Sequence, residues 1–268
     1  MRVTVITPSK NQGNYIGDCL RSVHGQTHRD IEHIVLDGLS TDATAEVAAQ
    51  FPCTFLSSKD TGAAQAINRG LEMATGDIVC WLNADDVFWS NTTLERIVGL
   101  FTELPHVDIV TGNGYYIDEK GNFLQPIFGR PDRVSLRWLK CFDILLQPAT
   151  FWRRNQFRLD ESLRYCFDWK LWLDFSLSGL NLLYLPEYFA LYRVHSSSLT
   201  QQDSARRRGE VFSMSRQYDR RRVQVLWCWI VWRIYKLSES LHYPGLKRAA
   251  LAINQTLSSI TDGRYGSI

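Results

Sequence analysis

The sequence has 268 residues, a net charge of +2, 45% hydrophobic residues and 22% charged residues, which is ordinary for one folded domain with an appendage. The near-neutral charge and the absence of a recognition motif disfavour a nucleic-acid-binding protein, and no apolar run approaches the roughly 20 residues that span a bilayer. The six cysteines stand singly, mostly in apolar stretches, which is typical of buried, reduced thiols in a cytoplasmic protein rather than of a disulfide framework or a zinc site.

Strand-like and helix-like patterns alternate over the first 115 residues, beginning with an apolar run that reads as a strand and not as a signal peptide. Strands are expected at residues 3–9, 31–38, 53–58, 77–83 and 107–113, and helices at 15–23, 40–51, 63–74 and 92–101. The run at 77–83 is apolar on both faces, which indicates a central strand. This alternation predicts an α/β fold with a mostly parallel central sheet flanked by helices.

A polar loop follows each of the first four predicted strands, with the sequences TPSKNQG, DGLSTD, KDTG and NADD. Ligands bind to open α/β sheets at the carboxyl ends of the strands, so the four loops are expected to line one crevice. The chain has no P-loop, no Gly-x-Gly-x-x-Gly after its first strand and no Gly-x-Ser-x-Gly elbow. The expected crevice therefore needs a different ligand chemistry.

Asp85 and Asp86 follow the fourth predicted strand, and the sequence places no cation beside them. Neighbouring carboxylates repel each other, and their burial is costly unless a positive partner arrives. A divalent cation, Mn²⁺ or Mg²⁺, bound together with a diphosphate would supply that charge, since both ions prefer carboxylate oxygens. The alternative is that the two acids only cap the turn after the strand.

The composition changes after Thr200. Between Arg206 and Arg248 there are 11 Lys/Arg and 3 Asp/Glu, a charge of +8, together with Trp227, Trp229, Trp232 and Tyr235. Basic and aromatic residues in this mixture favour a helix that lies on an anionic membrane surface, which predicts a cytoplasmic protein in peripheral contact with the inner face of the cell membrane. The alternative is a helix packed on the rest of the chain or on a second copy in a homodimer.

Four segments, VTVITPSKNQGNYIGDCLRSV, IEHIVLDGLSTDAT, DTGAAQAINRGLEMATGDIVCWLNADD and QPATFWRR, together resemble family 2 glycosyltransferases over roughly residues 2–200. The resemblance implies a GT-A nucleotide-diphospho-sugar transferase fold and inverting, metal-dependent transfer of a sugar from a nucleotide-sugar donor, a UDP-sugar by expectation. The acceptor would be a hydroxyl of a glycan, such as a polysaccharide or a lipid-linked glycan. It implies a catalytic domain at 1–200, with a nucleotide-sugar-binding half (1–115) and an acceptor-binding half (116–200), before a helical tail (201–268).

The resemblance also implies roles for individual residues. Donor binding falls to Pro8, Ser9, Asn11, Asp37, Asp60, Asn68, Arg69 and Asp85, the metal to Asp86 and His195, and the acceptor side to Gln147 and Trp152. Two positions depart from the family's usual pattern, because Leu39 follows Asp37-Gly38 and Asn83 replaces the first acid of the metal motif. Trp152 as a core residue, Arg69 as a solvated helix residue and His195 as a structural histidine remain alternatives.

Asp168 matches the family's catalytic base. Sugar transfer with inversion needs one carboxylate to take the proton of the acceptor hydroxyl. Cys166, Phe167 and Trp169 surround Asp168 in the sequence, and apolar surroundings raise the pKa of a carboxyl toward the working pH. Asp174 on the same predicted helix is the rival base, although a solvent-facing position is favoured for it.

Two other functions remain open at this point. A nucleotidyltransferase also combines acids, a metal and a nucleotide, but TPSKNQGNY is a poor phosphate-binding loop. A catalytically silent nucleotide-sugar-binding scaffold is the second alternative, and the presence of Asp85, Asp86 and Asp168 counts against it. Hydrolysis of a donor by the purified protein would separate these possibilities.

Overall fold

The computed structural model describes residues 1–128, 139–140, 143–196, 198 and 205–218. The chain divides into two compact units, Met1–Val211 and Phe212–Ile268, and the second is described only as far as Tyr218. The aromatic part of the predicted tail lies outside the described residues. Among the described helices, we find none with the length and apolar content that crossing a bilayer requires.

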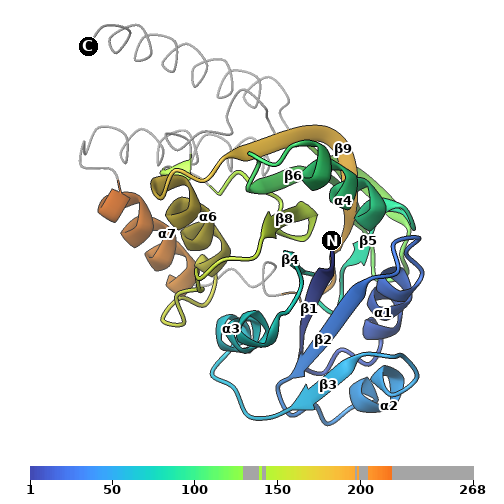
Figure 1. The fold of residues 1–268 in the computed structure, drawn as a ribbon. Coiled ribbons are helices and arrows are strands. Elements are labelled where there is room, and N and C mark those ends of the chain that lie inside the picture. Colours follow the sequence, from blue (N-terminus) through green and yellow to red (C-terminus); the bar gives the residue numbers. More distant parts are fainter. Residues whose placement is uncertain (129–138, 141–142, 197, 199–204, 219–268) are drawn as a thin grey trace, which may run out of the picture. The chain divides into compact units, whose positions relative to one another are not determined.

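Within the described residues, nine strands form one mixed sheet in the order β3-β2-β1-β4-β8-β6-β9-β5, with β7 paired to β6 (Figure 1). The strands are β1 (Val3–Ser9), β2 (Ile31–Asp37), β3 (Thr54–Ser57), β4 (Ile78–Trp81), β5 (Val87–Phe88), β6 (Ile109–Ile117), β7 (Phe123–Ile127), β8 (Thr150–Arg153) and β9 (Leu182–Arg193). The helices are α1 (Ile16–His24), α2 (Thr44–Ala48), α3 (Ala63–Met73), α4 (Thr93–Glu103), the 3₁₀ helix η2 (Gln147–Ala149), α6 (Phe167–Leu177) and α7 (Ala205–Tyr218).

All nine elements predicted over the first 115 residues are present. The sheet is parallel in its first half, where β1 pairs with β2 and β4, and β2 pairs with β3. The second half is mixed, because β8 runs antiparallel to both of its neighbours, β4 and β6, while β6 and β9 pair in parallel. The short strands β5 and β8 have two and four residues, too few to show a periodic signal in the sequence.

Alternation of side chains along the strands divides the core between the two faces of the sheet. One face packs on α1 and α4 through the apolar cluster that includes Val3, Cys80, Leu94, Ile97 and Phe151. On the other face, Trp81 and Trp152 pack on Trp172 of α6, with ring centroids 5.5 and 5.8 Å away. Also on this face, a Cβ added to Gly70 of α3 would meet Ile6 of β1 at 2.5 Å, so this helix needs glycine for its close approach.

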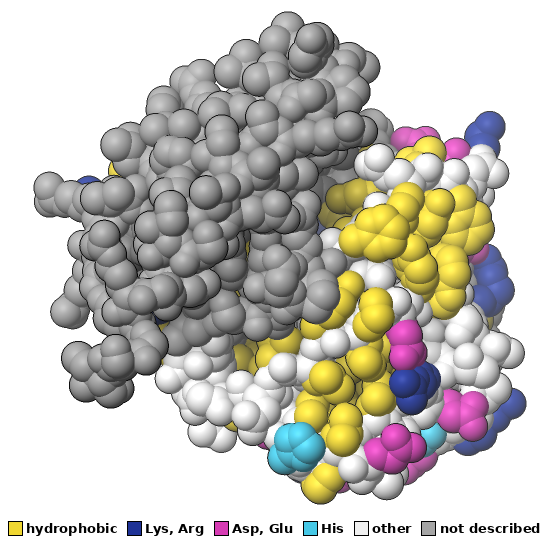
Figure 2. All heavy atoms as spheres, turned by 90° about the horizontal axis from the view of Figure 1, so that it is seen from above, with side chains coloured by type: hydrophobic (Ala, Val, Ile, Leu, Met, Phe, Trp, Pro, Cys, Tyr) yellow, Lys and Arg dark blue, Asp and Glu magenta, His cyan; other side chains and the backbone are white. Residues whose placement is uncertain are grey.

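Hydrophobic side chains gather over part of the face shown in Figure 2. Four exposed large apolar residues, Trp89, Phe123, Leu124 and Phe128, come from the region of β5 and β7. Three of their rings contact one another or Tyr188, and the closest centroids are those of Trp89 and Tyr188 at 4.9 Å. Of these residues only Trp89 is close in the chain to Asp85 and Asp86.

A buried histidine makes the stability of the fold depend on pH. His33 in β2 is 4% exposed, its Nε2 lies 3.0 Å from Thr7 Oγ1, and its Nδ1 lies 3.2 Å from His24 Nε2. Burial, and secondarily the charge on His24, lowers the pKa of His33 to about 3. The unfolded chain takes up this proton near pH 6.5, so the stabilisation is present above that pH and is lost as the pH falls below it.

We therefore expect the free energy of unfolding to fall by roughly 2 kcal/mol between pH 7 and pH 5 because of His33 alone. Urea denaturation at the two pH values measures this difference. His33→Gln should remove most of the pH dependence, whereas the same change at the exposed His106 should leave it intact. An equal pH dependence in the His33→Gln variant and the unaltered protein would rule out this origin.

Candidate functional site

The first three strands end side by side at the carboxyl edge of the sheet. In the parallel register Ser9 lies opposite Asp37, and Asp37 lies opposite Ser57. The loops that follow also touch, since the Asn11 N–H donates to Ser40 Oγ at 2.7 Å and a Cβ on Gly38 would meet Asp60 Oδ2 at 2.8 Å. The loops after β1, β2 and β3 are thus brought together, as the sequence predicted.

A buried acid and an unpaired hydroxyl form the corner of this edge. Asp37 is 3% exposed, and its Oδ2 accepts hydrogen bonds from the Ser40 N–H at 3.0 Å and from Ser57 Oγ at 2.6 Å. Ser9 Oγ, which follows Pro8 on β1, is buried and has no hydrogen-bond partner among the described residues. A buried hydroxyl without a partner costs about 1–3 kcal/mol, so this corner contains a group that a ligand would satisfy.

Two residues in the adjoining loops have a left-handed backbone, Asn11 with φ 52° and Leu39 with φ 61°. Asn11 suits this conformation, and its Oδ1 accepts the Thr41 N–H at 2.9 Å. Leu39 does not suit it, and its side chain is 53% exposed. A strained, exposed leucine beside Asp37 is the kind of feature that persists at functional sites.

Replacing Leu39 by asparagine is expected to raise the free energy of unfolding by about 1 kcal/mol, since asparagine tolerates a left-handed backbone better than leucine. Urea denaturation measures the change. Leu177, an exposed leucine at the end of α6 with no positive φ, provides the control, and Leu177→Asn should bring no gain. Equal losses of stability in the two variants would show that the backbone of Leu39 stores no strain.

Helix α3 contributes two predicted residues with different surroundings. Arg69 donates to Ser58 Oγ in the loop after β3, next to Asp60. Asn68 is 6% exposed, and its amide binds the backbone of Leu159 at 2.8 and 3.0 Å and Glu161 Oε1 at 2.9 Å. The polar atoms of Asn68 are therefore used to tie α3 to residues 159–161, whereas Asp60 and Arg69 lie by the loops of the strand ends.

Asp85 and Asp86 point in different directions. Asp86 is 1% exposed, and its oxygens accept hydrogen bonds from the Arg193 N–H and from Asn83 Nδ2, each at 3.0 Å. Burial, and next the charge on Asp85, raises the pKa of Asp86 well above its usual range. The Asp85 side chain is 19% exposed, and its Oδ2 lies 2.9 Å from His195 Nε2. Of the two carboxylates that of Asp85 is the more accessible, and the His195 side chain that it contacts is 1% exposed.

Arg193 at the end of β9 is a site residue that the sequence analysis missed. Its side chain is 2% exposed and donates from Nε to the Asp85 carbonyl at 2.9 Å and from Nη2 to Asp18 Oδ2 at 2.9 Å. The cation absent from the sequence around Asp85 and Asp86 is thus supplied more than 100 residues later in the chain. The only sequence signal was an arginine that ends a long apolar run two residues before His195.

Asp168 lies in the first turn of α6, where its Oδ1 accepts the Trp169 N–H at 2.8 Å. Burial raises the pKa of Asp168 to about 6, although backbone hydrogen bonds and the nearby Arg207 act in the opposite direction. Lys170 Nζ donates hydrogen bonds to both carboxylate oxygens of the rival base, Asp174, each at 2.6 Å. Asp143, which sequence reasoning missed, lies near enough to Asp168 for the two charges to repel.

The two residues expected on the acceptor side are part of the framework. Gln147 accepts from Asn83 Nδ2 at 3.0 Å and donates to the Trp81 carbonyl at 2.7 Å, which joins η2 to the end of β4. Trp152 is 2% exposed and packs among Trp81, Trp172 and Phe175. In this structure the Trp152 ring is enclosed in the core, which is the alternative to an acceptor role for this residue.

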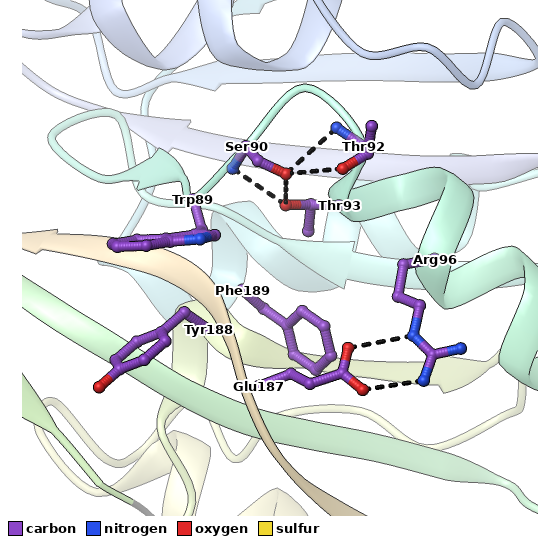
Figure 3. Close-up of a pocket in the computed structure, with 8 residues that line it drawn as sticks. All are labelled: Trp89, Ser90, Thr92, Thr93, Arg96, Glu187, Tyr188 and Phe189. Carbon is purple, nitrogen blue, oxygen red and sulfur yellow. Dashed lines mark hydrogen bonds and ion pairs between the residues drawn. The ribbon is translucent and has the colours of Figure 1, made fainter.

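A groove of about 350 Å³ opens beside these elements, where the connection from β5 to α4 faces β9 (Figure 3). Arg96 crosses it to form a two-point ion pair with Glu187, at 2.8 and 3.0 Å. Its lining consists of Trp89, Ser90, Thr92, Thr93, Arg96, Glu187, Tyr188 and Phe189, none of which is a predicted site residue. We therefore place the candidate site at the carboxyl edge of the sheet and not in this groove.

Comparison with known sequences gives one family. The profile described as "Glycosyl transferase family 2" matches residues 4–175. An uncharacterised glycosyltransferase of Rickettsia typhi is 29% identical over 214 residues, which cover 74% of this chain and 65% of that protein. The putative teichuronic acid biosynthesis glycosyltransferase TuaG of Bacillus subtilis is 28% identical over 211 residues, covering 74% of this chain and 81% of that protein. The chain thus spans slightly less than two thirds of the length of the Rickettsia relative.

Solved structures with a similar fold include two complexes with nucleotide-sugars. S. aureus TarS 1–349 with UDP-GlcNAc has a TM-score of 0.66 at 19% identity, covering 80% of this chain and 65% of that chain. The mannosyltransferase PcManGT from Pyrobaculum calidifontis, with GDP-Man and Mn²⁺, has a TM-score of 0.60 at 20% identity, covering 100% and 76%. At these identities the likeness is one of fold.

Proposed function

This chain belongs to glycosyl transferase family 2 and is a glycosyltransferase of GT-A fold, and we propose that it moves a sugar, with inversion, from a nucleotide-diphospho-sugar to an acceptor hydroxyl. The observation that carries the proposal is the pairing of the accessible Asp85 carboxylate with His195, 2.9 Å apart, at the end of the strand next to the Ser9–Asp37 corner. The family match disfavours the nucleotidyltransferase alternative.

The Ser9–Asp37 corner supports a nucleobase site. A carboxylate oxygen can accept from a ring N–H, and a serine hydroxyl can donate to a ring carbonyl, so a uracil would supply the partner that Ser9 Oγ lacks. Pro8, Asn11, Asp60 and Arg69 lie on or beside the same loops. A UDP-sugar is therefore the first candidate donor, and the UDP-GlcNAc bound by the TarS structure agrees with this choice.

Asp85 and His195 fit a divalent cation, Mn²⁺ or Mg²⁺. Two neighbouring ligands on one octahedral ion stand about 3 Å apart, which is close to the observed 2.9 Å between Oδ2 and Nε2. Within the described residues no group of three or more His, Cys, Asp and Glu side chains could hold a metal, so the diphosphate and water would complete the coordination. When bound, the ion would neutralise charge on the leaving diphosphate, while Asp86 would hold the turn in place.

Asp168 is the proposed general base. With a pKa raised to about 6, its carboxylate is still ionised at neutral pH but binds a proton more tightly than an ordinary aspartate does. It would take the proton of the acceptor hydroxyl as that oxygen attacks the sugar. Asp174 is less suited to this role, because Lys170 neutralises it.

The proposed acceptor is a glycan hydroxyl, carried by a polysaccharide or by a lipid. The name of the TuaG relative, with its reference to teichuronic acid biosynthesis, supports a cell-envelope glycan. Contact of the basic tail with the membrane would bring the chain to the surface that carries a lipid-linked acceptor. The tail is described only as far as Tyr218, and its aromatic residues Trp227, Trp229, Trp232 and Tyr235 lie outside the described residues.

A thermal-shift screen of UDP-, GDP- and dTDP-sugars, each with and without Mn²⁺, tests the proposal. A donor at about 100 times its dissociation constant should stabilise the protein by roughly 2.7 kcal/mol, and only with the metal present. The stabilising donor should then be hydrolysed slowly by the purified protein. If none of the sugars raises the melting temperature in Mn²⁺ and none is hydrolysed, the proposed function is overturned.

A further inference from the structure

Arg193 is a buried arginine whose guanidinium joins three segments around the Asp85–His195 pair. It donates from Nε to the Asp85 carbonyl at 2.9 Å, from Nη2 to Asp18 of α1 at 2.9 Å, and from Nη1 to the carbonyls of Asp118 and Glu119 at 3.3 and 3.1 Å. The turn after β4, helix α1 and the turn between β6 and β7 are therefore held by one side chain.

The backbone of the same residue fixes the turn a second time, because the Arg193 N–H donates to Asp86 Oδ1 at 3.0 Å. His195 follows two residues later. Main chain and side chain of Arg193 thus bind consecutive residues of the turn that carries the accessible carboxylate.

Tyr15 connects the guanidinium to the histidine ring. The Cζ atom of Arg193 lies 5.3 Å from the centroid of the Tyr15 ring, and that ring lies 4.6 Å from the ring of His195. Arginine binds the face of an aromatic ring, and a ring packed against an imidazole restricts how that imidazole can rotate. Arg193 therefore acts on both members of the pair, on Asp85 through its carbonyl and on His195 through Tyr15.

We propose that Arg193 is the positioning residue of the Asp85–His195 pair, and that it holds the carboxylate and the imidazole at the spacing a divalent cation needs. The part of this inference that concerns the cation rests on the proposed function, whereas the part that concerns the geometry of the pair does not. Outer-shell residues of this kind typically change metal affinity by about 10–100-fold when they are replaced.

The chain offers a closely matched control in Arg153 of β8. Arg153 donates from Nε to the Val107 carbonyl at 2.8 Å and from Nη2 to the Phe101 carbonyl at 2.6 Å. Its Cζ atom lies 5.1 Å from the Phe101 ring centroid. Both arginines thus bind carbonyls and an aromatic face, but Arg153 touches no residue of the candidate site.

The experiment compares the full-length protein with Arg193→Lys and Arg153→Lys. Imidazole ¹H–¹⁵N spectra at one fixed neutral pH report the tautomer and environment of His195 without any metal, and calorimetry with MnCl₂ in the presence of UDP reports the affinity for the cation. Lower melting temperatures are expected for both variants. Only Arg193→Lys should shift the His195 signals and weaken Mn²⁺ binding by about 10-fold or more.

Unchanged His195 signals and unchanged Mn²⁺ affinity in folded Arg193→Lys would overturn the proposal, as would equal effects of the two lysine variants. If Arg193→Lys does not fold, Tyr15→Leu and Tyr15→Phe replace it. The leucine should shift the His195 signals and the phenylalanine should preserve them, and identical spectra for the two would again overturn the proposal. If the unaltered protein binds no Mn²⁺, the proposed metal fails, while the spectra still decide whether Arg193 positions His195.

Discussion

Replacing Asp168 by asparagine is expected to lower the rate of sugar transfer by roughly 10²–10⁴-fold and to leave the affinity for the donor unchanged. The amide keeps the shape of the side chain and its place in the first turn of α6, but it cannot take the proton of the acceptor hydroxyl. Initial rates of transfer, together with calorimetry of UDP binding in Mn²⁺, separate the two effects.

The unaltered enzyme should also lose activity as the pH falls through about 6, where Asp168 becomes protonated. The Asp168→Asn variant should show no such decline in its residual rate. Asp174→Asn is the matched control, because Asp174 lies on the same helix. This change removes the ion pair with Lys170 but leaves the proposed proton acceptor, Asp168, in place. If Asp174→Asn stops turnover and Asp168→Asn does not, the assignment of the base must be reversed.

Asp85→Asn should weaken Mn²⁺-dependent binding of the donor by roughly 100-fold or more, beyond the range for an outer-shell partner. The change removes the charge of the accessible carboxylate that lies 2.9 Å from His195, while the turn keeps its bonds to Asp86 and to the Asp85 carbonyl. The measurement is calorimetric titration with UDP, once with saturating MnCl₂ and once without MnCl₂.

Asp86→Asn serves as the comparison and is expected to give the opposite pattern. The Asp86 side chain is buried and accepts hydrogen bonds from Arg193 and Asn83. Its replacement should therefore lower the melting temperature and leave the affinity for Mn²⁺ close to that of the unaltered protein. Loss of metal binding in Asp86→Asn, with metal binding retained in Asp85→Asn, would restore the assignment made from the sequence.

The sequence predicted the first half of the sheet well because its strands and helices are long enough to show their periods. The run at 77–83 is apolar on both faces, and β4 is indeed enclosed between β1 and β8. The position of β8 was not predictable, since four residues carry no periodicity and their partners lie about 40 and 70 residues away in the chain.

The sequence predicted which residue types form the site better than it predicted the role of each residue. The adjacent acids Asp85 and Asp86 look equivalent in the sequence, and only the hydrogen bond from the Arg193 N–H shows which of them turns inward. Trp152 likewise has two readings until its neighbours are known, because a tryptophan that faces a sugar and one that fills a core have the same sequence signal. Long-range partners, which no local pattern encodes, decide each of these cases.

The insertion of β8 between β4 and β6 also constrains how the chain can be made. While residues 1–149 leave the ribosome, β4 has a partner on one edge only, and its strand is apolar on both faces. An open apolar edge of this kind is a template for aggregation until it is covered. We expect the nascent chain to depend on protection from chaperones until Thr150–Arg153 closes the sheet, and a fragment that stops at residue 115 to precipitate instead of folding.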